Sequence, residues 1–370
     1  RYSRYRNVST AALRTQGIDV ILESASFTRN CHLTLSQCSL KASRYLLTDG
    51  YGFSPFRVEK PNKPLWCHQL IQLDSLPQKI AIIGSGTSVV EWAYKLSQFA
   101  AVSILCNTPD LLPSEDRDIQ RLVKVQLQYA DIFVHFVSDL DIEANKLPAI
   151  VDAEIAVSVP RPDGPSELAL EKLGVSAKKG IKVNRYLQTQ SPKLYVTGSC
   201  LGGEHNPAIT RQETEIALTN ALFSRQRPIQ YEQITYGMDG GSTMGRWGMT
   251  ERQANHRCGE RVQVFRASCL PLKNEDAAQT NFCKLIVLEN RLLGIHLLGH
   301  GALSLARQFG GSLTMTMLAK RAAKYCEPGT GTLIEAVYGA FSQWEDNRWQ
   351  PGKWRRDWAE NWFNWCRRSC

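Results

Sequence analysis

The sequence lacks most of the features that mark membrane-spanning, metal-binding and nucleic-acid-binding proteins. It contains no run of 18 or more apolar residues, and its arginine-rich start, RYSRYRNVST, lacks the apolar segment of a signal peptide. No two cysteines form a C-x-x-C pair, and the seven histidines do not cluster with cysteines at zinc-site spacing, so we predict no metal site. The net charge of +9 is scattered without a block of like charges, which predicts a generally basic surface and no nucleic-acid partner.

The cysteines are numerous but do not follow the spacing of a disulfide scaffold. Eleven of them, an odd number, are spread through apolar segments, and this indicates reduced thiols in a cytoplasmic protein. The 370 residues exceed one ordinary core, and 43% of them are hydrophobic. We therefore predict a globular chain with two or three separate cores.

The strongest local pattern is a strand, a glycine turn, a helix and a second strand in KIAIIGSGTSVVEWAYKLSQFAAVSILCN. An apolar strand runs into Gly84-Ser85-Gly86, and apolar residues at helical period follow. Glycines at such a turn let the backbone approach a pyrophosphate over the helix N-terminus, so we predict a nucleotide-binding βαβ unit. A helix over 116–129 and strands in ADIFVHFV and AEIAVSV extend this prediction to an α/β domain over 76–160 with a parallel sheet.

Two departures from the usual dinucleotide fingerprint accompany this turn. The third glycine position of G-x-G-x-x-G holds Val89, and the second strand ends at Cys106-Asn107, where an acidic residue for a ribose hydroxyl is usual. The preference between NAD and NADP therefore cannot be derived from this segment. A fold that survives around a vestigial nucleotide site is the alternative that these departures leave open.

Segments on both sides of the βαβ unit predict a second, discontinuous domain. Strand-like strings in 17–48 indicate a small β-meander within residues 1–75. Within residues 161–228, GIKVN and KLYV indicate two strands that lead to a glycine turn, and a helix is expected over 207–223.

The last third of the chain has the pattern of an α+β domain over residues 229–345. We predict strands in VQVFRASCLPL, NFCKLIVLEN and RLLGIHLLG, the last two joined as a hairpin at Glu289-Asn290. Two helices, near 302–308 and 313–324, are expected to close it. His296 and His300 lie in apolar surroundings here, which favours a structural role over a catalytic one.

The tail, residues 346–370, is rich in tryptophan. Trp354, Trp358, Trp362 and Trp365 recur at spacings of four, four and three residues, so a helix would carry them on one face. Such a face can enter the groove of a partner protein or lie at a membrane interface, which would make the protein peripheral to a membrane. It can equally pack on its own chain or on a second copy.

Several of these segments together resemble the pyridine nucleotide-disulfide oxidoreductases, the family of dihydrolipoyl dehydrogenase, glutathione reductase and mercuric reductase. The βαβ string resembles the NAD(P)H-binding domain, and SRYLLTDGYGFSP and KLYVTGSCLGG resemble two flavin-binding segments. GRWGMTERQA and NFCKLIVLENRLLGIHLLGHGA resemble the dimer-interface domain. The resemblance implies an α/β fold, with a Rossmann-like nucleotide-binding domain, a remnant flavin domain over 1–75 and 161–228, and an α+β interface domain.

The resemblance also implies cofactors, a homodimer and specific contact residues. FAD and NAD(P) are the implied cofactors. The nicotinamide nucleotide would contact Gly84, Gly86 and Glu91, and the flavin would contact Gly50, Gly198 and Ser199. The family carries an aspartate at the position of Ser199, and a serine hydroxyl can accept a hydrogen bond but supplies no charge.

The thiol chemistry of the family is not matched by this sequence. The stretch PGTGTLIEAV keeps Glu335, the implied catalytic residue, but Thr330 stands where the family has its acid/base histidine, and threonine does not titrate near neutrality. The first flavin fingerprint and the redox C-x-x-x-x-C are not present in residues 1–370, and Cys31 and Cys38 are expected to be core thiols rather than substitutes. We therefore predict hydride transfer from NAD(P)H through flavin to an unknown acceptor, without dithiol exchange. The alternative is an inactive scaffold or a truncated fragment acting through its interface domain and Trp-rich tail.

Overall fold

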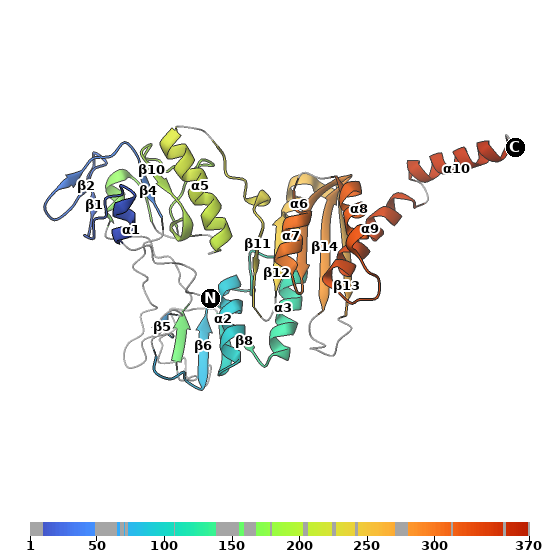
Figure 1. Cartoon of the computed structure of the whole chain (residues 1–370), viewed down its shortest axis with the longest axis horizontal. Coiled ribbons are helices and arrows are strands. Elements are labelled where there is room, and N and C mark those ends of the chain that lie inside the picture. The colour runs from blue at the N-terminus through green and yellow to red at the C-terminus, as the bar shows by residue number, and fades with distance from the viewer. Residues whose placement is uncertain are drawn as a thin grey trace.

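The computed structural model describes two five-stranded sheets with helices against them, and smaller elements beside them (Figure 1). The described residues are 10–48, 65–66, 70, 73–106, 108–137, 155–158, 168–177, 180–202, 206–223, 227–240, 243–270, 280–311, 314–350 and 353–368. The predicted α/β fold is confirmed. No helix among these residues has both the length and the apolar character needed to cross a bilayer.

The first large sheet, called here the nucleotide sheet, is parallel and has the strand order β5-β9-β6-β7-β8. Its strands are β5 (Leu65–Trp66), β6 (Lys79–Ile83), β7 (Ala101–Cys106), β8 (Phe133–Phe136) and β9 (Ile155–Ser158). Helix α2 (Thr87–Ser97) joins β6 to β7, and α3 (Arg117–Tyr129) joins β7 to β8. The predicted strand, turn, helix and strand are therefore confirmed, because the apolar faces of β6 and α2 are buried against each other.

The N-terminal strands form two small sheets instead of one meander. Strands β1 (Ser26–Phe27), β2 (Leu33–Thr34) and β3 (Ser39–Leu40) are antiparallel neighbours, and the short α1 (Thr10–Thr15) precedes them. Strand β4 (Tyr45–Leu47) leaves this sheet and pairs in parallel with β10 (Leu194–Val196). The prediction of a meander that includes SRYLLT was thus wrong, since a strand about 150 residues away supplies the partner of β4.

Two further predictions in this region need correction. The segment GIKVN is not a strand, so β10 alone leads to the glycine turn, which forms the 3-10 helix η6 (Gly198–Leu201). Cys31 is buried as expected, but Cys38 is exposed. The helix predicted over 207–223 is confirmed as α5 (Pro207–Phe223), and a second 3-10 helix, η5 (Leu170–Leu173), comes before β10.

The second large sheet, called here the C-terminal sheet, is antiparallel with the order β11-β12-β15-β14-β13. Its strands are β11 (Tyr236–Met238), β12 (Met244–Gly248), β13 (Val262–Cys269), β14 (Asn281–Leu288) and β15 (Arg291–Leu298). The hairpin predicted at Glu289-Asn290 joins β14 to β15, and Glu289 has a positive φ of 55° there. Short helical turns η7 (Tyr231–Gln233) and η8 (Gly259–Arg261) and helix α6 (Glu251–Cys258) lie among these strands.

Three helices, not the predicted two, pack on one face of the C-terminal sheet (Figure 1). The two expected helices are α7 (Ala302–Phe309) and α8 (Met315–Tyr325), and the additional one is α9 (Leu333–Arg348). Helix α9 contributes Val337, Phe341 and Trp344, all almost completely buried. Gly339 interrupts the apolar positions of α9 and is a poor helix former, which weakens the helical pattern of this segment in the sequence.

The other face of the C-terminal sheet packs against α2 and α3. Met244, Phe282 and Leu298 from three of its strands share one apolar core with both helices. The strand β14 is consequently buried on both faces. The helices of the nucleotide sheet therefore pack directly against the C-terminal sheet. A cluster of charged side chains lies within this interface.

Candidate functional site

The glycine turn between β6 and α2 has the backbone geometry expected of a phosphate-binding turn. Gly84 has a φ of 140°, a region that favours glycine, and its N–H donates to the Leu105 carbonyl at 3.0 Å. Gly86 is the N-cap of α2 in extended conformation, and no side chain caps the helix there. Leu112 N–H donates to the Ser85 carbonyl at 2.7 Å, so the loop after β7 anchors the turn. The two predicted glycines thus lie together at the start of α2.

Glu91, the other residue predicted for the nucleotide, has a partner within the chain, and the two positions that depart from the fingerprint, Val89 and Cys106, have contacts within the chain as well. The Glu91 carboxylate accepts the Asp239 N–H at 2.8 Å, so it also links α2 to the end of β11. Burial raises the pKa of Glu91, while this hydrogen bond and Lys95 oppose the rise. Val89, in the third glycine position, is buried in the core of α2 and β6. The Cys106 thiol at the end of β7 donates to the Thr108 carbonyl at 3.4 Å.

The carboxyl ends of β4 and β10 bring two segments predicted for flavin to one edge. The parallel pairing sets Leu47 opposite Val196, and Thr197 N–H donates to the Leu47 carbonyl at 2.9 Å. Gly198, with a φ of 71°, and the buried Ser199 follow β10 directly. Gly50 follows β4 but lies outside the described residues.

Glu213 of α5 holds the glycine turn after β10. Its carboxylate accepts the Gly198 N–H at 2.8 Å and the Tyr231 hydroxyl at 2.8 Å. Burial and the neighbouring Glu213 charge raise the pKa of the Tyr231 hydroxyl. Tyr231 therefore remains a neutral donor, and the Gly198 turn is fixed by a buried carboxylate that the sequence analysis did not identify.

Glu335, the residue predicted to be catalytic, lies in the first turn of α9 and binds the preceding loop. Its two carboxylate oxygens accept the N–H groups of Gly329 at 3.0 Å and Gly331 at 2.9 Å. Thr330, in the position of the family's histidine, donates its hydroxyl to the Glu327 carbonyl at 2.8 Å. Both side chains thus fix the loop at the start of α9.

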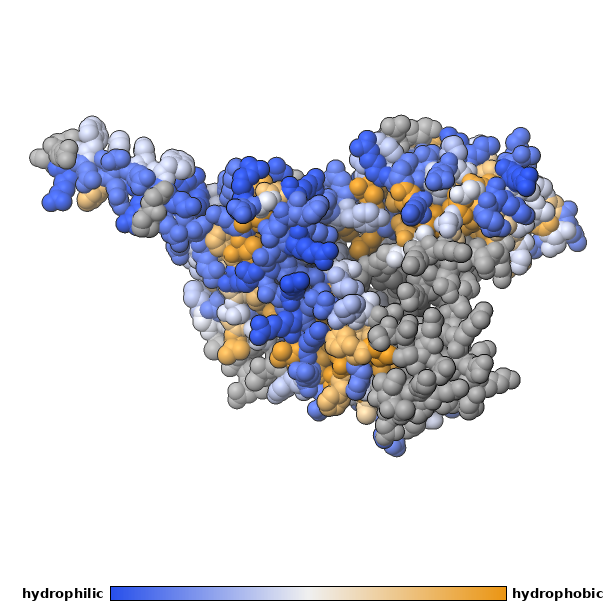
Figure 2. All heavy atoms as spheres, turned by 180° about the vertical axis from the view of Figure 1, so that it is seen from behind, coloured by the Kyte–Doolittle hydropathy of each residue, from blue (hydrophilic) through white to orange (hydrophobic). Residues whose placement is uncertain are grey.

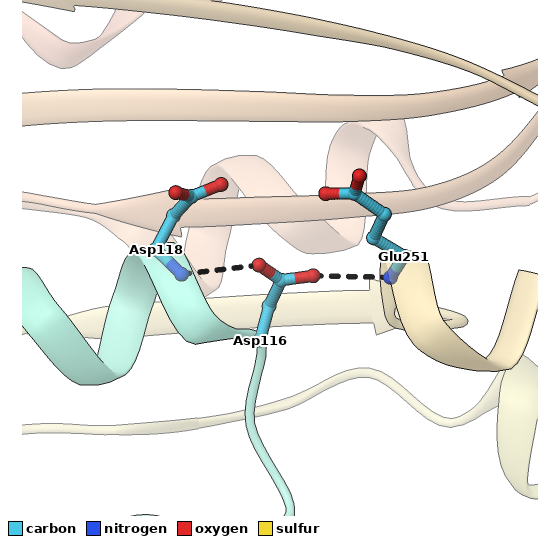
Figure 3. Close-up of side chains that lie close together, drawn as sticks. All are labelled: Asp116, Asp118 and Glu251. Carbon is cyan, nitrogen blue, oxygen red and sulfur yellow. Dashed lines mark hydrogen bonds between the residues drawn. The ribbon is translucent and has the colours of Figure 1, made fainter. Parts of the chain in front are cut away.

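A cluster of charged side chains, absent from the sequence prediction, joins the nucleotide sheet to the C-terminal sheet. Asp116 is the N-cap of α3, and its carboxylate accepts the N–H of Asp118 at 3.2 Å and of Glu251 at 3.0 Å (Figure 3). One carboxylate therefore caps both α3 and α6, helices more than 130 residues apart in sequence. Negative charge at a helix N-terminus is stabilising, and here two termini share it.

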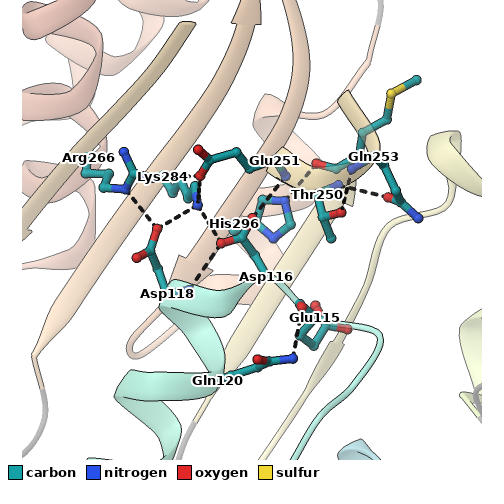
Figure 4. Close-up of polar contacts among 11 residues, drawn as sticks. Glu115, Asp116, Asp118, Gln120, Thr250, Glu251, Gln253, Arg266, Lys284 and His296 are labelled. Carbon is teal, nitrogen blue, oxygen red and sulfur yellow. Dashed lines mark hydrogen bonds and ion pairs between the residues drawn. The ribbon is translucent and has the colours of Figure 1, made fainter. Parts of the chain in front are cut away.

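Lys284 of β14 neutralises this cluster. Its ammonium group, only 1% exposed, lies 2.5 Å from Asp116, 2.6 Å from Asp118 and 2.6 Å from Glu251 (Figure 4). Arg266 adds contacts to Asp118 at 2.8 Å and Glu251 at 2.6 Å from the exposed side. We name these five residues the lysine cluster. Burial would lower the pKa of Lys284, but hydrogen bonds from its ammonium to the three carboxylates raise it overall.

The geometry of the lysine cluster argues against a metal ion. The oxygen atoms of Asp116, Asp118 and Glu251 lie within 4.8 Å of one another, a spacing that could suit a cation. The Lys284 ammonium contacts all three carboxylates, so it occupies the position that a metal would need. The cluster lines a pocket of about 750 Å³, together with Thr250, Gln253 and neighbouring polar residues. A lysine within the apolar strand NFCKLIVL was the sequence signal that could have predicted the cluster.

From Lys284 of the lysine cluster, a row of three buried side chains crosses the sheet in register. Arg246 of β12 pairs with His296 of β15, which pairs with Lys284 of β14. Arg246 donates to the Ser114 carbonyl at 2.7 Å and contacts the Glu115 carboxylate at 3.5 Å. The loop before α3 therefore supplies acceptors for Arg246, at one end of this row.

His296 is fully buried and neutral, in agreement with the predicted structural role. Its Nε2 contacts the Met249 carbonyl at 2.9 Å, and since a carbonyl only accepts, Nε2 carries the proton. Nδ1 has no hydrogen-bond partner. Burial and the nearby Arg246 charge lower the pKa of His296 to about 4.

We expect the folded chain to lose stability as the pH falls from 6.5 to 4, because of His296. The unfolded chain binds a proton with the ordinary histidine pKa of 6.5, whereas the folded chain resists protonation until about 4. Within that window the free energy of unfolding should fall by about 1.4 kcal/mol per pH unit from this group. Urea unfolding at several pH values measures it, and His296→Gln should flatten the slope. An unchanged slope in that variant would contradict the assignment.

The sequence is similar to one family of known proteins over more than half of its length. The sequence profile of the family described as "Pyridine nucleotide-disulphide oxidoreductase" matches residues 3–221. Mercuric reductase from Staphylococcus aureus is 24% identical over 350 residues, 87% of this chain and 63% of that protein. Dihydrolipoyl dehydrogenase from Bacillus subtilis is 29% identical over 206 residues, 51% of this chain and 44% of that protein. The chain thus spans less than two thirds of the length of these relatives.

Solved structures show the same fold at low identity. LpdA from Mycobacterium tuberculosis has a TM-score of 0.68 and 18% identity, with coverage of 93% of this chain and 81% of that one. The HOCl-induced flavoprotein disulfide reductase RclA from Escherichia coli has a TM-score of 0.66 and 20% identity, with coverage of 92% and 82%. The likeness therefore extends over nearly the whole chain.

Proposed function

Because the chain belongs to the pyridine nucleotide-disulphide oxidoreductase family, we propose that it binds NAD(P)H at the Gly84–Gly86 turn and passes hydride to FAD. The electron acceptor is a small molecule or protein other than a dithiol. Threonine at position 330 cannot exchange protons with a thiol near neutrality, which is why dithiol exchange is not included. The chain would thus retain the step of the family's chemistry in which NAD(P)H reduces the flavin.

The observation that carries this proposal is the turn between β6 and α2. Gly84 has a φ that suits only glycine without strain, and Gly86 begins α2 without a side-chain cap. A pyrophosphate bound over this helix start would meet backbone N–H groups and the positive end of the helix dipole. Glu91, further along α2, is proposed as a contact of the nicotinamide nucleotide.

The flavin contact is proposed for the carboxyl ends of β4 and β10. Gly198 leaves room for close approach of a ligand, and the buried Ser199 can hydrogen-bond a polar chain of the cofactor. Glu213 fixes this turn through the Gly198 N–H. Gly50 is proposed as a third contact, from the segment after β4.

The nicotinamide supplies hydride, and the protein supplies binding and alignment. The Gly84 turn would hold the pyrophosphate, while the contact of Glu91 with Asp239 fixes α2 against β11. The rigid core shared by α2, α3 and the C-terminal sheet keeps this arrangement in place. Alignment of the two ring systems is the contribution that the chain's own residues make to the rate.

Titration of the purified chain with NADH and NADPH, read by nucleotide fluorescence, tests the proposal. The expected dissociation constant lies between about 1 μM and 1 mM, the usual range for enzyme substrates. Reconstitution with FAD should add flavin absorbance and permit NAD(P)H oxidation. Nucleotide binding without flavin uptake would remove the hydride-transfer step, and absence of both would remove the proposal.

A non-catalytic scaffold is the second candidate function, and the role of Glu335 favours it. In the family resemblance this residue supports catalysis, but here both its oxygens accept loop N–H groups. The scaffold would associate as a homodimer through its C-terminal sheet and helices. Light scattering tests that part, since a monomer at micromolar concentration would contradict it.

Replacement of Glu335 separates its two roles. We expect Glu335→Ala to destabilise the chain by about 1–2 kcal/mol, because the Gly329 and Gly331 N–H groups lose a charged acceptor. Glu335→Gln, which retains one acceptor oxygen, should lose about half as much. Thermal unfolding measures this loss. A fall in NAD(P)H oxidation without any loss of stability would instead assign Glu335 to catalysis.

A further inference from the structure

The C-terminal helix α10 (Trp354–Arg368) exposes a row of large aromatic side chains. The exposed fractions of Trp354, Trp358, Trp362 and Trp365 are 71%, 61%, 54% and 60%. Single exposed apolar residues are common, but a continuous apolar surface of this kind usually marks an interaction site. Packing on the body of its own chain is therefore not the role of this row.

The tryptophans form one continuous surface, as their spacing predicted. The rings of Trp358 and Trp362 stack with centroids 5.9 Å apart, and those of Trp362 and Trp365 are 5.2 Å apart. In Figures 1 and 2 the helix extends away from the two sheets and their helices. The indole row is consequently open to a large, flat partner.

The charges of α10 identify the chemistry of that partner. Residues 353–368 contain five basic side chains and two acidic ones, so the segment is positively charged. The Arg355 guanidinium lies 5.1 Å from the ring centre of Trp354, beside the indole row. Arg356 forms an ion pair with Glu360 at 2.6 Å on the other side of the helix. A negatively charged surface complements this arrangement.

We propose that α10 binds the surface of anionic lipid bilayers, with the indole row in the headgroup layer. Indole rings favour this layer because they combine an apolar body with one N–H donor. Basic residues beside an amphipathic helix attract anionic lipids. The helix is roughly 22 Å long and lies flat, since crossing needs about 30 Å of apolar length. This inference is independent of the proposed catalytic function.

Vesicle binding by the full chain tests the proposal directly. The chain should co-sediment with vesicles of equal phosphatidylcholine and phosphatidylglycerol at least about tenfold more strongly than with phosphatidylcholine alone. Binding should weaken at 1 M salt, because charges are then screened beyond roughly 3 Å. Tryptophan emission should move to shorter wavelength on binding. Equal binding to both vesicle types, or no binding, would overturn the proposal.

Variants on and away from the tryptophan face of α10 provide a second test with a matched control. The double variant Trp358→Ala with Trp362→Ala should bind anionic vesicles at least about tenfold more weakly, because two indoles that enter the headgroup layer on binding are lost. Glu360→Gln should bind more strongly, because it frees Arg356 from its ion pair. Asn364→Ala, away from the indole row, should bind like the unmodified chain.

The same variants distinguish a protein partner from a lipid surface. If the row contacts a second copy of the chain, the double tryptophan variant lowers the mass measured by light scattering and leaves vesicle binding unchanged. That result would overturn the lipid proposal. Unchanged mass together with weakened vesicle binding supports it. Unfolding midpoints should match in all variants, since the replaced side chains are exposed.

Discussion

Replacing Lys284 with methionine is expected to destabilise the folded chain by about 3–5 kcal/mol, the usual effect of breaking a buried ion pair from one side. Lys284 is 1% exposed and contacts three carboxylates, and Asp116 is itself 3% exposed. Methionine fills a similar volume, so the loss comes from uncompensated negative charge and not from a cavity. Urea unfolding of Lys284→Met at neutral pH measures it.

Arg266 provides the matched control for Lys284. It contacts the same Asp118 and Glu251, but its side chain is 43% exposed, so solvent screens the pairs. Arg266→Met should therefore change the free energy of unfolding by no more than about 1 kcal/mol. Adding Asp118→Asn to Lys284→Met should recover part of the loss, because one unpaired charge disappears. Equal effects of Lys284→Met and Arg266→Met would contradict our account of the lysine cluster.

The loss of stability caused by Lys284→Met should also loosen the structure around the proposed nucleotide site. The lysine cluster ties the starts of α3 and α6 together through Asp116, and α3 follows the loop that anchors the glycine turn at Ser85. Weakening it would loosen the packing between the nucleotide sheet and the C-terminal sheet. A local rise in amide hydrogen exchange at the start of α3 would be its first sign.

Replacing Gly84 with alanine is expected to weaken NADH or NADPH binding by roughly tenfold to a hundredfold. An alanine at a φ of 140° is strained by about 1–3 kcal/mol, and relief of that strain moves the turn. Its methyl group would also meet a bound pyrophosphate. The measurement is the nucleotide fluorescence titration described above, with the variant compared at equal folded fraction.

Gly259→Ala is a suitable control for Gly84→Ala. Gly259 also has a positive φ, 66°, and no atom lies within 4 Å of the methyl group that alanine would add. It lies after α6, away from the glycine turn. Both variants should lose stability, but only Gly84→Ala should lose nucleotide affinity. Equal nucleotide affinity in the two variants would contradict the assignment of the phosphate-binding turn.

The elements that the sequence determined by itself are those with a local pattern. The apolar strand, glycine turn and helix from Lys79 to Ser97, the hairpin at Glu289-Asn290 and helix α5 all follow from hydrophobic period and turn residues within short windows. The tryptophan row on α10 follows from the same helical period. The family, too, was evident from the order of such segments along the chain.

The tertiary structure alone decided the contacts between residues distant in sequence. The pairing of β4 with β10, the capping of two helices by Asp116 and the neutralisation of that carboxylate by Lys284 each join segments more than 100 residues apart. Local pattern carries no information about such partners, because a lone aspartate before a helix and a lone lysine in a strand are each compatible with many folds. In the folded chain a buried charge is costly unless an opposite charge or hydrogen bonds compensate it, and Lys284 compensates Asp116 in this way.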